Sequence, residues 1–162
     1  MQTQLATGIT KLTVRVYGLL FDENMRLLVS DEFIRGNYFT KFPGGGLELG
    51  EGTRDFLRRE FKEETNLDVT IGEHLYTTDF FQPSAFNNVD QILSIYYEVH
   101  CSQSHQLTTK TTPFDFAPEQ VADPYGCSEV FRWIGWADLH EDVVSLPIDK
   151  IVVRIAKEKF GK

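Results

Sequence analysis

The sequence is poor in cysteine and lacks metal-binding clusters of cysteine and histidine. Its two cysteines, Cys101 and Cys127, form no CxxC pair and belong to no Cys/His cluster. The four histidines also lack the spacing of metal ligands. These absences exclude a disulfide framework and a zinc site of the usual kind, so we expect both thiols to be reduced.

Positive charge is also scarce, because the formal net charge is −8. A surface that binds nucleic acid needs clustered Lys and Arg, so the balance argues against such a partner. A phosphate-bearing ligand must instead be met by local cations or metal ions. The chain has no apolar run of about 18 residues, and its first residues lack the apolar segment of a signal peptide. We therefore expect a cytoplasmic protein that binds neither nucleic acid nor membrane.

The 162 residues have the length of one α/β domain, which we expect to cover residues 1–162. Runs of β-branched and aromatic residues predict a hairpin made of residues 10–21 and 26–30. A loop is expected at 31–40, and the sequence "KFPGGG" at 41–46 predicts a short strand that breaks into a glycine turn.

The period of the apolar residues then changes to that of a helix. The helix is expected to begin at Thr53 as its N-cap and to end at Asn66 as its C-terminal cap. A second helix is expected at 147–160, with Ile151, Val152 and Ile155 facing inward. Further strands are predicted at 67–81, 91–101 and 129–136. The polar segment 102–128 is too long for an idle connection and is interpreted as a flap or as an excursion with short strands.

The first helix carries three acidic residues on one turn, Glu60, Glu63 and Glu64. Carboxylates four residues apart repel one another by a few tenths of a kcal/mol, so a sequence shaped only by stability would avoid them. One interpretation is a solvated face in which Arg59 pairs with Glu63. The other is a site for Mg²⁺ or Mn²⁺, which take hard oxygen ligands and share the rest with substrate phosphates.

The stretch "GGGLELGEGTRDFLRREFKEETNLD" at 44–68 resembles the signature of the Nudix hydrolases, G-x5-E-x7-R-E-U-x-E-E-x-G-U with U an apolar residue. It matches from Gly45 to Leu67 at every fixed position but one, where Asn66 replaces glycine. Because Asn also serves as a helix C-cap, the change affects the helix end and leaves the carboxylates intact. The resemblance implies an α/β/α sandwich with a mixed central sheet.

The resemblance also implies a function and a metal site. It implies a Mg²⁺- or Mn²⁺-dependent hydrolase that cleaves a nucleoside diphosphate linked to another moiety. ADP-ribose or a nucleotide sugar is the first expectation, and a (d)NTP is the second. The expected metal ligands are Glu60, Glu63, Glu64 and the carbonyl of Gly45.

We assign catalytic roles to Glu63, Glu64, Glu51 and Arg59. Arg59 is expected to pair with Glu51 and so to hold the loop against the helix, unless the two form only an exposed salt bridge. The general base stays open: it is Glu63 or Glu64, or one of three acids outside the motif, Glu119, Asp123 and Glu129.

Aromatic and basic residues are expected to choose the substrate. The candidates are Tyr38, Lys41, Phe80 and Phe81, although aromatic residues at such positions are often core. Two alternatives to a hydrolase are a Nudix-like module that senses a nucleotide without cleaving it and an isomerase of small diphosphates. The resemblance is also compatible with a homodimer.

Overall fold

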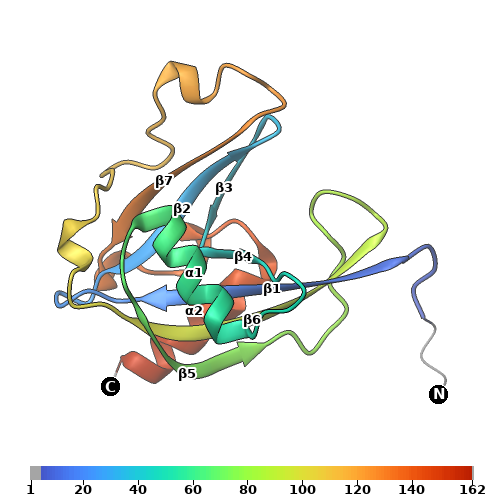
Figure 1. Cartoon of the computed structure of the whole chain (residues 1–162), viewed down its shortest axis with the longest axis horizontal. Helices are drawn as coiled ribbons and strands as arrows, with labels where there is room; N and C mark the ends of the chain where they lie inside the picture. Colours follow the sequence, from blue (N-terminus) through green and yellow to red (C-terminus); the bar gives the residue numbers. More distant parts are fainter. Residues whose placement is uncertain (1–4, 162) are drawn as a thin grey trace.

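The computed structural model describes residues 5–161 (Figure 1). The first four residues of the segment considered for a signal peptide lie outside this range. Neither of the two described α-helices has the length and apolar character that crossing a bilayer requires. The strands are β1 Lys11–Leu20, β2 Leu27–Ile34, β3 Asn37–Lys41, β4 Gly44–Gly46, β5 Thr70–Thr77, β6 Asp90–His100 and β7 Cys127–Ile134. The α-helices are α1 Thr53–Thr65 and α2 Pro147–Phe160.

The strands form two sheets. Sheet A has the order β4-β1-β6-β5 and sheet B the order β3-β2-β7. In sheet A, β1 runs parallel to β6 and antiparallel to β4, whereas both pairings in sheet B are antiparallel. The predicted mixed sheet is therefore confirmed.

Strand β1 lies between the two helices, because its alternate residues enter different cores. Val16 and Leu20 pack in the core that contains Phe61 of α1. Tyr17 and Leu19 pack in the core that contains Val152 of α2. Successive strand residues point to opposite faces, so α1 and α2 cover opposite faces of the sheet. Figure 1 shows this arrangement, which confirms the α/β/α sandwich.

The predicted hairpin of residues 10–21 and 26–30 is wrong. Its arms lie in different sheets, and the Phe21–Leu27 bridge with hydrogen bonds between Asp22 and Arg26 joins them at the turn. Strand β1 pairs with β6 along its length and with β4 at residues 15–17, whereas β2 pairs with β3 and β7.

The loop expected at 31–40 is also wrong, because strand β2 continues to Ile34 and pairs with β3. Arg35 and Gly36 form the two-residue turn between them, with φ of 48° and 83°. Positive φ at both central residues is typical of the type I′ hairpin turn. The predicted glycine turn is likewise a strand, because Gly44–Gly46 pair with β1. A Cβ at Gly44 would lie 2.1 Å from Val16 O, which explains why glycine is needed there.

Both predicted helices are confirmed, with changes in detail. Helix α1 has Gly52 at its N-cap in place of Thr53, and Asn66 ends it with φ of 59° as expected. In α2 the buried face consists of Ile148, Asp149, Val152, Val153 and Ala156. Ile151 and Ile155 are only partly buried, so the inward face is rotated from the predicted one.

The segment 102–128 is an excursion with two short 3₁₀ turns, and its described residues form no regular strand until β7 begins at Cys127. It is attached to β7 by the bond from Lys110 N to Phe131 O, 2.7 Å. A second attachment is the bond from Phe114 N to Asp31 Oδ2, 3.2 Å. Asp31 is fully buried and accepts two bonds from Arg132 and one from Thr40. The excursion is thus fixed to a buried ion pair of sheet B.

Candidate active site

The site begins where strand β4 meets helix α1. Phe56 and Phe61 are buried and fix the helix against sheet A. This packing brings Glu60 to the strand, because a Cβ built on Gly45 would lie 3.7 Å from Glu60 Oε2. This distance is an ordinary van der Waals contact, so the strand backbone at Gly45 lies beside the Glu60 carboxylate.

Arg59 joins the loop before the helix to the acidic turn. Its Nε and Nη2 donate to the two oxygens of Glu51 at 2.6 and 2.9 Å, and its Nη1 donates to Glu63 Oε2 at 3.0 Å and to Glu60 Oε1 at 3.3 Å. The bond from Arg59 lowers the pKa of Glu51, and Glu51 followed by Glu63 raises the pKa of Arg59. The structure brings Glu51 and Arg59 together as predicted.

Glu60 and Glu64 form a second acidic pair. Burial, followed by the nearby charge of Glu129 and a hydrogen bond with Glu60, raises the pKa of Glu64 to about 9. Part of the Glu64 side chain keeps contact with solvent. Carboxylates this close to one another are stabilised by a shared proton or by a cation.

Sheet B supplies the opposite wall of the site. Glu32 and Glu129 are register partners on β2 and β7, and Lys41 Nζ lies 2.5 Å from Glu32 Oε2. Burial, with a contribution from the charge of Arg15, lowers the pKa of Lys41 to about 8. Ser30 Oγ donates to Glu129 at 2.6 Å, while burial raises the pKa of Glu129. Glu32, Lys41, Glu129 and Glu64 line one open cavity of about 480 Å³, called the acidic cavity below.

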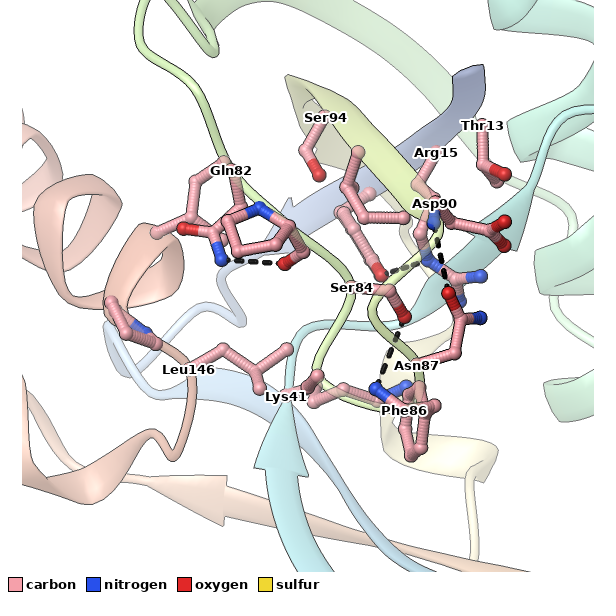
Figure 2. Close-up of a pocket in the computed structure, with 16 residues that line it drawn as sticks. Thr13, Arg15, Lys41, Gln82, Ser84, Phe86, Asn87, Asp90, Ser94 and Leu146 are labelled. Carbon is pink, nitrogen blue, oxygen red and sulfur yellow. Dashed lines mark hydrogen bonds between the residues drawn. The ribbon is translucent and has the colours of Figure 1, made fainter. Parts of the chain in front are cut away.

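A second cavity of about 210 Å³ opens beside the acidic cavity, and we call it the side pocket (Figure 2). Arg15, Lys41 and Phe86 line both cavities, so the two are joined. The walls of the side pocket come from β1, from β6 with the loop 82–90 before it, and from the start of α2. Together the two cavities reach the size of typical small-molecule sites.

Comparison with known proteins identifies the family. The family model described as the NUDIX domain matches residues 11–151. This chain belongs to the Nudix family. The match covers most of the chain and both sheets, and it supports pyrophosphohydrolase activity. No curated protein sequence matches the Nudix chain.

Solved structures show the same fold. A NUDIX hydrolase from Nitrosomonas europaea has a TM-score of 0.61 and 18% identity, with coverage of 90% of this chain and 88% of that chain. The E. coli ORF135 protein has a TM-score of 0.60 and 16% identity, with coverage of 93% of each chain. A protein described as a UDP-X diphosphatase has a TM-score of 0.57 and 14% identity, with coverage of 98% of this chain and 66% of that chain. At these identities the likeness shows the fold.

Nudix hydrolases generally use divalent metals, and the residues of this Nudix chain fit one. Glu60, Glu64 and the backbone at Gly45 supply hard oxygen atoms at the junction of α1 and β4, where burial and then the charge of Glu129 raise the pKa of Glu64. Within residues 5–161, no three Asp, Glu, His or Cys side chains are already gathered around one metal-sized point. Glu63 is drawn to Arg59, away from the position predicted for a ligand.

The three acids predicted as a base outside the motif differ in position. Glu129 lines the acidic cavity together with Glu64. Glu119 and Asp123 are exposed on the excursion, and neither lines the acidic cavity or the side pocket. Register explains the difference, because pairing with Glu32 places Glu129 on the inner face of sheet B.

Of the four residues predicted to bind substrate, only Lys41 lies at the joined cavities. Tyr38 is on the opposite face of β3 and packs on Phe33 and Phe114. Its neighbour Phe39 shares the face of Lys41 and contacts Phe86 instead. Successive residues of a strand point to opposite faces of the sheet. Because residues 31–40 were expected to form a loop, no such alternation was predicted for Tyr38 and Phe39.

Phe80 and Phe81 are also placed elsewhere, in a shallow groove beside the start of β6. The aromatic residues that line the side pocket are Tyr17, which is buried, and Phe86, which lies six and five positions beyond Phe80 and Phe81. Three residues that line the side pocket were not predicted from the sequence: Arg15, Phe86 and Asp90. A single cation within the otherwise apolar strand "TVRVYG" was a signal for Arg15, whereas the two loop residues had none.

Proposed function

We propose that this Nudix chain hydrolyses the diphosphate of a nucleoside diphosphate linked to another moiety, with Mg²⁺ or Mn²⁺. The observation that carries the proposal is the acidic cavity, which is lined by Glu64 of the motif helix and by Lys41 and Glu129 of the other sheet. Cations and carboxylates facing each other across one cavity suit a metal-bound diphosphate. A nucleotide sugar or ADP-ribose is the first substrate class, and a (d)NTP is the second.

Each residue is given a role in this proposal. Glu60, Glu64 and the carbonyl of Gly45 would hold the cation, which would neutralise charge on the phosphate oxygens when bound. Glu51 and Arg59 position the acidic turn. Glu63 keeps its predicted role as a ligand if it leaves Arg59.

Glu129 is our choice for the general base. It lines the acidic cavity, unlike Glu119 and Asp123, and burial raises its pKa, which makes the carboxylate a stronger base. Lys41 would meet the diphosphate, since its ammonium lies between the acidic cavity and the side pocket. The protein is proposed to act in the cytoplasm on a small molecule, in keeping with its net charge of −8.

The experiment is turnover on a panel of ADP-ribose, nucleotide sugars, dinucleoside polyphosphates, (d)NTPs and coenzyme A, with products separated by chromatography. Reactions contain Mg²⁺, Mn²⁺ or EDTA, and they compare the wild type with Glu64→Gln. The matched control is Glu158→Gln, the same change at an exposed position of α2. Metal-dependent cleavage that Glu64→Gln abolishes and Glu158→Gln retains supports the proposal. Tight binding without any cleavage supports the alternative, a nucleotide-sensing module.

A further inference from the structure

The side pocket contains polar groups that have no partner within the described part of the chain. Thr13 Oγ1 is buried there without a hydrogen bond. The carboxylate of Asp90 lines the same pocket and makes no hydrogen bond or ion pair with the described residues. The Thr13 hydroxyl is an unpaired buried atom, whereas Asp90 is half-buried and its carboxylate also meets solvent, so this wall offers free polar groups to a polar ligand.

The loop that carries Asp90 is held by its own hydrogen bonds. Ser84 N donates to Asp90 O at 2.9 Å, and Ile92 N donates to Gln82 O at 2.8 Å. The side chain of Asn87 accepts from Val89 N at 2.9 Å and from Asp90 N at 2.8 Å. The loop therefore presents its side chains from a fixed frame, which reduces the ordering cost of binding.

The same bonds fix the orientation of the Asn87 amide. Two backbone N–H donors require the oxygen Oδ1, so the donor Nδ2 is the atom left for a ligand. Figure 2 shows Asn87 and Asp90 with Arg15 at one end of the pocket and Gln82 and Leu146 at the other. This end of the pocket thus offers a carboxylate acceptor beside an amide donor.

We propose that the side pocket selects the guanine base of a nucleotide, with Asp90 accepting from N1–H and the N2 amino group and Asn87 Nδ2 donating to O6. The inference rests on the proposed function, because it names the base of the nucleotide that the site takes. It replaces ADP-ribose, the first substrate expected from the sequence, by a guanine nucleotide.

The chemistry of the other bases favours guanine. Only guanine places two adjacent N–H donors on one edge, where they meet both oxygens of a carboxylate. Adenine and cytosine each present an amino group beside a ring nitrogen that is itself an acceptor and repels the second oxygen. Uracil presents one N–H between two carbonyl oxygens, which also repel a carboxylate.

The joined cavities place this base correctly relative to the acidic cavity. Phe86 lines both cavities and is 48% exposed, so a face of its ring is free to stack on a base. Arg15 and Lys41 also line both cavities and would meet the phosphates that follow the base. A guanine in the side pocket therefore directs its diphosphate toward Glu64.

The test has a binding arm and a turnover arm. Affinity for GDP, ADP, UDP and CDP is measured by calorimetry with EDTA, and kcat/KM is measured with Mg²⁺ on the glucose esters of the same four diphosphates. The variants are Asp90→Asn and Asn87→Asp, of which the second keeps the Oδ1 acceptor of the loop, removes the Nδ2 donor and adds a negative charge. Asp142→Asn, at an exposed residue paired with Lys150, is the matched control. Melting temperatures verify that each variant is folded.

We expect GDP to bind about 10- to 100-fold more tightly than ADP, UDP or CDP, the discrimination of a bidentate base contact. Asp90→Asn and Asn87→Asp should reduce that preference to within about threefold, while Asp142→Asn retains it. Equal affinity for all four diphosphates overturns the inference, as does an equal loss for all four in Asp90→Asn, which would indicate that Asp90 only supports Arg15. A GDP preference without turnover would retain the guanine pocket and reject the hydrolase, and turnover without base preference would do the reverse.

Discussion

Replacement of Asp31 by alanine should lower the free energy of unfolding by about 3–5 kcal/mol. Asp31 is fully buried and accepts from Arg132 Nε at 2.8 Å, from Arg132 Nη2 at 3.0 Å and from Thr40 Oγ1 at 2.7 Å. Arg132 is only 9% exposed, so the substitution leaves a buried guanidinium without its counter-ion. This uncompensated charge is the source of the large cost.

The effect is measurable by urea and thermal denaturation followed by circular dichroism. For a chain of this length the loss corresponds to a fall of about 6–20 °C in the melting temperature. Asp142→Ala is the control, because its exposed pair with Lys150 is worth about 1 kcal/mol or less. In a double-mutant cycle, Asp31→Ala with Arg132→Ala should lose less than the sum of the single losses.

A loss no larger than that of Asp142→Ala would refute the reasoning, and so would strict additivity in the cycle. Asp31 also accepts from Phe114 N, so the substitution should loosen the excursion 102–128. Limited proteolysis within this segment should therefore be faster in Asp31→Ala than in the control.

Three further predictions concern activity. Arg59→Ala should lower kcat/KM by about 10- to 100-fold because it releases Glu51 and Glu63. The control Arg58→Ala, which removes an exposed ion pair with Asp55, should change kcat/KM by less than about twofold. Equal kinetics of the two variants would contradict the positioning role of Arg59. Since burial lowers the pKa of Lys41 to about 8, its charge is lost as the pH rises through that value, so KM should rise there while kcat changes little. Lys41→Arg, which stays charged, should reduce this rise in KM. A KM that is independent of pH from about 7 to 9.5 would contradict the contact between Lys41 and the diphosphate. Chelation by EDTA should abolish turnover, and Mg²⁺ added in excess should restore it; full activity in EDTA would exclude metal dependence.

The local parts of the site could be predicted from the sequence. The spacing of Glu60, Glu63 and Glu64 fixes their helical turn whatever the rest of the chain does, and Asn66 ends the helix as expected. The pairing of Arg59 with Glu51 is also local, because Glu51 lies just before the helix and Arg59 lies eight residues later, within it. These contacts depend on backbone geometry over a short distance.

The opposite wall could not be predicted, because it depends on strand register. Glu129 reaches the acidic cavity through its pairing with Glu32, about a hundred residues away. Phe39 rather than Tyr38 faces inward because the Arg35–Gly36 turn sets the phase of β3. Sequence patterns within one strand predict alternation, but the face that meets the site depends on the partner strand.

The two sheets have a consequence for how such enzymes are found. The motif helix belongs to one sheet, whereas Lys41, Glu32 and Glu129 belong to the other. If Lys41 and Glu129 act as proposed, a homologous chain that keeps every residue of the motif but loses these two should fold its helix normally and have little activity. Searches for active homologues should therefore compare the residues of β2, β3 and β7 as well as the motif, since the motif contains only one wall of the proposed site.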